Sequence, residues 1–205
     1  MTSPKNQPTY DWDHLMATYR RYVHNTSLVV EVGASTPYRT LNLAPYCRQL
    51  IGVEYYQQRL PQDTANIHYI QGDWQHLSGL IKPNSADIVV SSHVIEHVLD
   101  DAQAISETYR VLRPGGVAII TTPNRQRLIR KLIEAFTGPR QFPHWEHQRE
   151  YNFEDLSKLL SCSAFKEFSI TPVSFGINSR LKLYLKKCPL IFKDYACFWE
   201  ILLIK

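Results

Sequence analysis

The chain has 205 residues, of which 44% are hydrophobic and 20% are charged, and its formal net charge is +4 at pH 7. This length and composition are typical of one globular domain that buries enough surface to need no disulfides or structural metals. The positive charge is too small to indicate a nucleic-acid-binding protein by itself.

The cysteine pattern and the chain ends bear on the compartment. Four scattered cysteines match neither a zinc-site spacing nor a disulfide framework, which indicates a reducing environment. The first 14 residues lack the apolar core of a secretory signal, and the apolar stretch 196–204 is shorter than the roughly 20 residues that cross a bilayer. We therefore expect a cytoplasmic protein without a membrane span.

Short β-branched runs alternate with helical segments through the first two thirds of the chain. After a polar tail, apolar residues at helical spacing predict an N-terminal helix within 1–25. Buried strands are expected at 28–33, 49–54, 67–73, 86–92 and 117–122. A helix over 100–112, ended by Gly115 and Gly116, precedes the fifth strand. This alternation predicts an α/β fold, a Rossmann-like and mostly parallel sheet with helices on both faces.

The last third of the chain follows another pattern. A helix is expected at 152–160, because Asn152 and Asp155 form a capping-box-like start. Runs 166–173 and 195–205 read as strands with no helix between them, so we expect a C-terminal antiparallel hairpin at one edge of the sheet. The whole chain, 1–205, is expected to be a single domain.

Two segments are expected to be additions to that domain. Residues 123–150 read as a helix followed by an irregular loop, and 174–194 is a basic insertion. We expect 137–150 to close over a bound ligand, with His147 and Arg149 pointing inward, because Gly138, Pro139 and Pro143 interrupt regular structure there and active-site loops commonly close to exclude water. The arginines and lysines of both segments form either a solvated face or an attraction for an anionic substrate.

Features typical of a nucleotide site follow the first two strands. Gly33 permits a tight turn, Ser35 or Thr36 can cap the next helix, and Pro37 suits its first turn. Glu54 ends the second strand, where a carboxylate can bind ribose hydroxyls. The second and third glycines of GxGxxG are missing, so the dinucleotide fingerprint is not met.

The segment 86–124, ADIVVSSHVIEHVLDDAQAISETYRVLRPGGVAIITTPN, closely resembles the fourth strand, helix and turn of the class I S-adenosylmethionine-dependent methyltransferases, type 11 small-molecule branch. VVEVGAS resembles the glycine loop of that family, IGVE its ribose-binding acid and QGDW its adenine-side loop. HQREYNFEDLSKLLSCSAF resembles a late segment of the branch. The resemblance covers roughly residues 28–170.

The resemblance implies S-adenosylmethionine as cofactor and assigns residues to its parts. Those at the methionine end are Glu31, Gly33, Ala34 and Ser35; those at the ribose and adenine are Glu54, Asp73 and Trp74; those beneath the sulfonium are Ser91 and Ser92. Ser35 and Pro37 stand where the family has glycines, which places cofactor affinity in question.

The pentad His93-Val94-Ile95-Glu96-His97 has alternative interpretations. It spells the inverted zinc-protease motif, but it follows a strand rather than lying within a helix. It also resembles the metal-binding ExxEH of ubiquinone-type O-methyltransferases, with His93 in place of the first acid. We favour a third interpretation, in which Glu96 and His97 orient the loop without a metal.

The implied function is methyl transfer to a small-molecule or glycan-like, anionic acceptor, most simply at oxygen. A neutral histidine is the usual base for a hydroxyl acceptor, so His93 and His147 are the catalytic candidates. A degenerate, non-catalytic methyltransferase-like partner is the alternative. An RNA or protein methyltransferase is less favoured because the chain lacks an RNA-binding module and an Asn-Pro-Pro-Tyr-type loop, and no nucleic-acid partner is expected.

Overall fold

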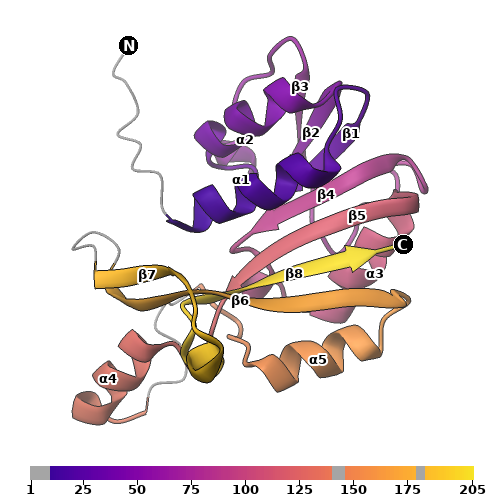
Figure 1. Cartoon of the computed structure of the whole chain (residues 1–205). Helices are drawn as coiled ribbons and strands as arrows, with labels where there is room; N and C mark the ends of the chain where they lie inside the picture. Colours follow the sequence, from indigo (N-terminus) through magenta and orange to yellow (C-terminus); the bar gives the residue numbers. More distant parts are fainter. Residues whose placement is uncertain (1–9, 140–145, 179–182) are drawn as a thin grey trace, which may run out of the picture.

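The computed structural model describes residues 10–139, 146–178 and 183–205, which form one eight-stranded sheet with helices on both faces (Figure 1). The strand order is β3-β2-β1-β4-β5-β8-β6-β7. The five strands β1 to β5 are parallel, whereas β8 pairs antiparallel with β5 and β6, and β7 pairs antiparallel with β6. The strands are β1 (Leu28–Val32), β2 (Gln49–Glu54), β3 (Ile67–Gln71), β4 (Ala86–Ser92), β5 (Leu112–Pro123), β6 (Glu167–Asn178), β7 (Leu183–Lys187) and β8 (Phe198–Ile204). The Rossmann-like, mostly parallel fold expected from the sequence is confirmed.

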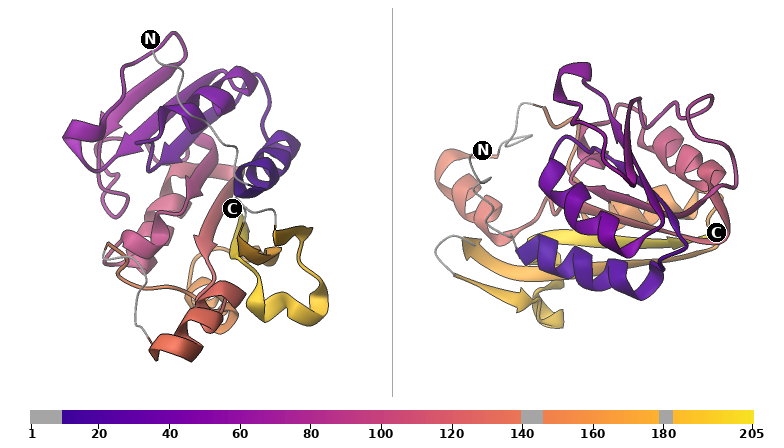
Figure 2. Two further views of the ribbon diagram at one scale, coloured as in Figure 1. Left: turned by 90° about the vertical axis from the view of Figure 1, so that its left-hand side faces the viewer. Right: turned by 90° about the horizontal axis from the view of Figure 1, so that it is seen from above.

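Helices cover both faces of the sheet and enclose two apolar cores (Figure 2). On one face, Leu15 and Tyr19 of α1 pack with Val29 and Ile88. On the other, residues of α3 and α5 pack with the opposite side chains of the same strands, Val30 and Val89 among them. The α-helices are α1 (Tyr10–Tyr22), α2 (Pro37–Leu43), α3 (Asp101–Val111), α4 (Leu128–Thr137) and α5 (Phe153–Ser161). The 3-10 turns are η1 (Ala44–Tyr46), η2 (Gln57–Arg59), η3 (Ile95–His97) and η4 (Leu190–Tyr195).

Side-chain caps begin the two helices that flank the later part of the site. Asp100 accepts a hydrogen bond from the Gln103 backbone N–H at 2.9 Å and starts α3. At α5, the Asp155 N–H donates to Asn152 Oδ1 at 2.9 Å and the Asn152 N–H donates to Asp155 Oδ2 at 3.1 Å. The capping box expected from the sequence is confirmed, and it fixes where the chain leaves the loop before α5.

The two expected C-terminal strands, β6 and β8, pair antiparallel as predicted, but the pair does not lie at the edge of the sheet. The last strand, β8, lies between β5 and β6, where Val117 faces Ile204 and Pro123 faces Phe198 across the β5 pairing. Buried side chains on both of its faces suit this interior position. The edge is taken by β7, part of the expected basic insertion, whose exposed Lys186 and Lys187 are typical of an edge strand.

Parts of three expected features lie outside the described residues: 1–9 of the polar tail, 140–145 of the loop and 179–182 of the basic insertion. The helix within 123–150 is present as α4, which lies against β6 at one end of the sheet (Figure 1). No helix in the described part of the chain has the length and apolar character needed to cross a bilayer.

Candidate active site

A cavity of about 630 Å³ opens where the parallel strands β1, β2 and β4 end. Its walls come from the loop after β1, the end of β2, the loop after β3 and the loop after β4. This is the edge at which open α/β sheets bind ligands, and the volume is within the range of cofactor pockets. The site predicted by the sequence is therefore a real concavity.

Backbone hydrogen bonds to the neighbouring strand hold the loop after β1. The N–H groups of Gly33 and Ala34 both donate to Val53 O, at 2.9 and 3.1 Å. Gly33 has φ +80°, and a Cβ added there would lie 2.3 Å from Val94 Cγ2. Ser35 lines the cavity, whereas Ala34 is fully buried behind it. A ligand can therefore approach this backbone closely, although the Ala34 N–H already has its acceptor.

The end of β2 contributes a carboxylate to the cavity. Glu54 lines it with only 5% of the residue exposed, and the Tyr56 backbone N–H donates to Glu54 Oε1 at 3.1 Å. Tyr55, Tyr56 and Arg59 also line the wall, and the Arg59 guanidinium lies 4.4 Å from the centre of the Tyr56 ring. Sequence reasoning missed these three residues, and their only signal was their position directly after the second strand.

The two residues assigned to the adenine side have different environments. Asp73 lines the cavity and accepts hydrogen bonds from the Gln75 backbone and side-chain amides at 2.9–3.1 Å. Trp74 also borders it, but its indole is 97% buried and donates to Thr108 Oγ1 of α3 at 2.9 Å. Asp73 is thus placed to receive a polar ligand group, while Trp74 mainly joins the loop to the core.

The end of β4 places His93 on the cavity wall. His93 has φ +56°, an uncommon conformation for a residue other than glycine, and its backbone N–H donates to Thr121 O at 2.9 Å. Its Nδ1 lies 3.6 Å from Glu96 Oε1. Of the two preceding serines, Ser92 lines the cavity and its carbonyl accepts from Arg39, while Ser91 is fully buried.

Glu31 lies beside the cavity rather than on its wall. Only 4% of the residue is exposed, and burial raises the pKa of its carboxyl to about 7, against the lowering effects of Thr40 and Arg39. Near neutral pH this acid is therefore close to half protonated. Its family role at the methionine end of the cofactor remains a proposal.

We expect Glu31 to make the free energy of unfolding depend on pH. Because its folded pKa of about 7 exceeds its ordinary value of 4.5, the folded state binds more protons than the unfolded state between these two pH values. Stability should therefore fall as pH rises through this window, by at most about 3 kcal/mol. In urea unfolding between pH 4.5 and 8, Glu31→Gln should flatten this decline, and the exposed-site control Glu154→Gln should not. Parallel curves for all three proteins would contradict the assignment.

The described end of the 137–150 segment lies against η3. The backbone N–H groups of Gln148 and Arg149 donate to Glu96 O at 2.8 and 3.3 Å. Glu146 and Gln148 line the cavity, and Glu146 Oε1 lies 3.6 Å from the Arg59 guanidinium on the opposite wall. Glu146 and Gln148 are therefore part of the cavity wall, whereas His147 between them does not line it, contrary to the expectation that it points inward.

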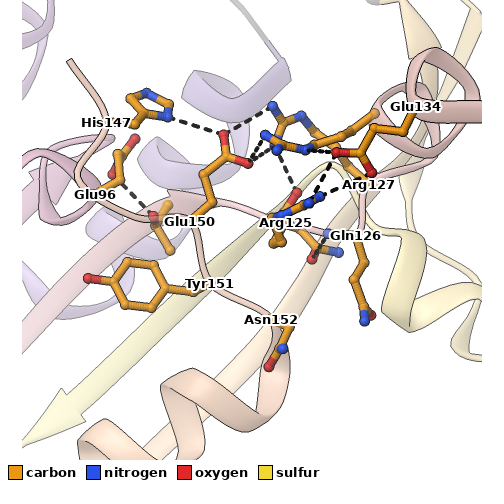
Figure 3. Close-up of polar contacts among 12 residues, drawn as sticks. Glu96, Arg125, Gln126, Arg127, Glu134, His147, Glu150, Tyr151 and Asn152 are labelled. Carbon is orange, nitrogen blue, oxygen red and sulfur yellow. Dashed lines mark hydrogen bonds and ion pairs between the residues drawn. The ribbon is translucent and has the colours of Figure 1, made fainter. Parts of the chain in front are cut away.

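His147 and Arg149 point in different directions from this wall. His147 Nδ1 lies 3.1 Å from Glu150 Oε1, and its ring centre is 4.7 Å from that of His97 (Figure 3 shows His147 with Glu150). Burial lowers the pKa of His147, which favours the neutral imidazole. Arg149 pairs instead with Asp101 at 2.8 Å and with the Leu99 carbonyl, in a second cavity between α3 and α5. The expectation that Arg149 points into the first cavity is wrong.

Buried ion pairs connect this segment to α4 (Figure 3). The Glu150 side chain, which is fully buried, pairs with Arg127 at 3.1 Å and Arg130 at 2.8 Å, and Arg130 pairs with Glu134 at 2.9 Å. Arg125 also pairs with Glu134, at 3.1 Å. From the sequence these arginines were a solvated face or an attraction for an anion; in the structure they neutralise acids of the same chain.

Comparisons with known proteins agree with this geometry. Residues 30–120 match a family model described as a methyltransferase domain. A probable S-adenosylmethionine-dependent methyltransferase of Mycolicibacterium smegmatis is 34% identical over 152 residues, which are 72% of this chain and 56% of that protein. One of Mycobacterium tuberculosis is 30% identical over 154 residues, 74% and 53% of the two chains. The chain thus spans about half the length of these curated relatives.

Solved structures share the fold over nearly the whole chain. The YcgJ protein of Bacillus subtilis aligns with a TM-score of 0.69 at 15% identity, covering 94% of this chain and 98% of that one. A SAM-dependent methyltransferase of Archaeoglobus fulgidus aligns with a TM-score of 0.67 at 17% identity, covering 95% and 94%. At these identities the likeness concerns the fold alone.

Proposed function

Because the chain belongs to the class I S-adenosylmethionine-dependent methyltransferases, we propose that it transfers the cofactor's methyl group to an oxygen atom of a small-molecule or glycan-like acceptor. The observation that carries this proposal is the Glu54 carboxylate, held on the wall of a 630 Å³ cavity at the carboxyl ends of the parallel strands. A carboxylate at this position can accept hydrogen bonds from both ribose hydroxyls.

The cavity residues fit this cofactor. Gly33 leaves room for a close approach that any side chain would block, and Ser35 is small enough to border the same space. Glu54 would bind the ribose and Asp73 the adenine side, whereas Ser92 lies at the end of β4 where the methionine part would pass. When bound, the cofactor supplies a methyl group on a positively charged sulfur, which the acceptor attacks in line.

His93 is the residue that would remove a proton from an acceptor hydroxyl. It lines the cavity, and Glu96 beside it would stabilise the imidazolium that forms. Its left-handed backbone carries a hydrogen bond to Thr121 O, and its ring lies 3.6 Å from Glu96 Oε1, which supports both backbone and side chain at this position. His147 lies behind His97, which makes it less suited to this role.

The class of acceptor rests on the charges at the cavity. Arg125, Arg127 and Arg130 are engaged with Glu134 and Glu150, which weakens their case as an anion-attracting surface. Of the two arginines that line the cavity, Arg59 pairs with Glu146, so Arg39 is the one that would favour an acceptor that carries a carboxylate or phosphate. One relative, of Coxiella burnetii, is named a malonyl-[acyl-carrier protein] O-methyltransferase; it is 26% identical over 172 residues, 83% of this chain and 56% of that protein.

Replacing Glu54 tests the cofactor site. Glu54→Gln should weaken S-adenosylhomocysteine binding about 10- to 150-fold, because charge-assisted hydrogen bonds worth about 1.5–3 kcal/mol are lost. Calorimetry on the folded variant measures this, with Glu154→Gln, an exposed acid on α5, as the matched control. Equal affinities in both variants would overturn the ribose assignment, and a wild type that binds no S-adenosylhomocysteine would overturn the enzyme proposal.

The acceptor is tested with methyl-labelled S-adenosylmethionine and fractionated cell extract. We expect label in the small-molecule or glycan fraction after protease and nuclease treatment. Label only in protein or RNA would contradict the proposed class. Cofactor binding without transfer to any fraction would favour the non-catalytic partner.

A further inference from the structure

Three residues of types that commonly bind metal ions come together at the edge of the cavity, from two separate segments of the chain. Glu96 and His97 belong to η3, and His147 lies in the segment before α5. One ligand atom from each residue lies within 4.8 Å of the others. The two hydrogen bonds from the 148–149 backbone to Glu96 O hold the segments together. The sequence suggested a possible metal set of His93, Glu96 and His97; in the structure His147 takes the place of His93.

Both histidines are oriented in the manner of metal ligands. His97 Nδ1 lies 3.1 Å from the Glu146 carbonyl oxygen, and His147 Nδ1 lies 3.1 Å from Glu150 Oε1. A metal-bound histidine commonly donates its second ring N–H to a carbonyl or carboxylate oxygen, which fixes the tautomer and the ring direction. Donation from Nδ1 would make Nε2 the ligating nitrogen of each ring.

The supporting oxygens are themselves fixed. Glu150 is held by ion pairs with Arg127 and Arg130 (Figure 3 shows Glu150 between His147 and the arginines). The Glu146 carbonyl is two residues before Gln148, whose backbone N–H is hydrogen-bonded to η3. The ring of His147 is therefore hydrogen-bonded to a carboxylate that a buried ion-pair network fixes in place. Such support is what a preorganised metal site requires.

Glu96 presents one carboxylate oxygen to which no donor of the described residues makes a hydrogen bond. The residue is 1% exposed, and Thr122 Oγ1 donates to its Oε2 at 3.1 Å. Within the described residues Oε1 accepts no hydrogen bond, and its separation of 3.6 Å from His93 Nδ1 exceeds hydrogen-bond distance. His93 at 3.6 Å offers Glu96 Oε1 an ion pair but no hydrogen bond at normal distance, and a bound cation would compensate the buried carboxylate more closely.

We propose that Glu96, His97 and His147 bind one divalent transition metal ion, with zinc as the best match. Two imidazoles and one carboxylate form a donor set that zinc uses in catalytic sites, where a fourth position stays open to water or substrate. His97 lines the cavity, so that open position would face it. There the ion would bind an acceptor oxygen beside His93 and acidify its hydroxyl. This role rests on the proposed function; the binding of the ion does not.

The competing interpretation is that His147 only completes the Glu150 ion-pair network. Its hydrogen bond to Glu150 would then hold the cavity wall in place, and its distance from Glu96 would have no chemical consequence. Both interpretations require the ring to be ordered, so only metal binding separates them.

Direct titration with zinc separates the two interpretations. The full-length chain, stripped with a chelator, is titrated with Zn²⁺ alone against a chromophoric zinc indicator. We expect one ion per chain. His97→Asn and His147→Asn should each weaken binding at least tenfold, and the exposed control His68→Asn should leave it unchanged. His93→Asn should change it less than threefold. X-ray absorption at the zinc edge should show nitrogen and oxygen ligands without sulfur.

Several outcomes would overturn the metal site. They are the absence of stoichiometric binding by folded wild type, sulfur ligands from the free cysteines, or a loss in His93→Asn as large as that in His147→Asn. Circular dichroism and urea unfolding are measured on every variant to show that it folds, and Glu96→Gln replaces any histidine variant that does not. If the cofactor fails to bind but zinc binds as described, the proposed function fails and the metal site stands.

Discussion

Replacing Gly33 with alanine should destabilise the cofactor end of the sheet, and by more than the same replacement at Gly79. The new Cβ would lie 2.3 Å from Val94 Cγ2, and φ is +80° at this position. Left-handed backbone costs about 1–2 kcal/mol for a residue with a Cβ, and overpacking adds about 1–3 kcal/mol. We expect Gly33→Ala to lower the free energy of unfolding in urea by about 3 kcal/mol and to abolish S-adenosylhomocysteine binding in calorimetry.

Gly79 offers a matched control for the backbone contribution. It has φ +86°, and among the described atoms nothing lies within 4 Å of an added Cβ. Gly79→Ala should therefore cost only about 1–2 kcal/mol. In a double-mutant cycle, Val94→Ala should recover the part of the Gly33→Ala loss that exceeds the Gly79→Ala loss. Equal losses at the two glycines would show that the contact with Val94 does not matter.

Arg130→Met should be the second most damaging change, because it opens the buried network under the cavity wall. The Arg130 side chain is 4% exposed and pairs with both Glu134 and Glu150. Glu150 would keep Arg127 and Glu134 would keep Arg125, but each carboxylate would lose a charge-assisted hydrogen bond inside the protein, at a combined cost of about 3 kcal/mol. Urea unfolding measures this loss, and hydrogen exchange should show faster opening of residues 146–151.

The same substitution at an exposed ion pair provides the control. Arg113 pairs with Asp87, but its side chain is 52% exposed. Arg113→Met should cost less than about 1 kcal/mol, because water compensates the remaining charge. If Arg113→Met proves as destabilising as Arg130→Met, burial of the network is not the reason for its stability. An Arg130 variant with unchanged exchange at 146–151 would show that the network does not hold the wall.

The sequence by itself determined the elements whose signals are local. Apolar runs and helical spacing located the five parallel strands and α3, and Asn152 with Asp155 located the start of α5. Gly33 and Glu54 identified the cavity edge, because parallel strands carry their loops to one side of the sheet. Each of these features depends on residues close together in the chain, whose backbone sterics and hydrogen bonds set the local structure.

Only the tertiary structure decided which distant segments meet. The insertion of β8 between β5 and β6 depends on the free energy of pairing strands far apart in sequence, and no local pattern records it. The burial of Trp74 against α3 is of the same kind. So is the position of His147, 50 residues from His97 yet against its ring. These placements follow from packing and ion pairing over the whole chain. Small differences in folding free energy select one arrangement among many that share the same local elements.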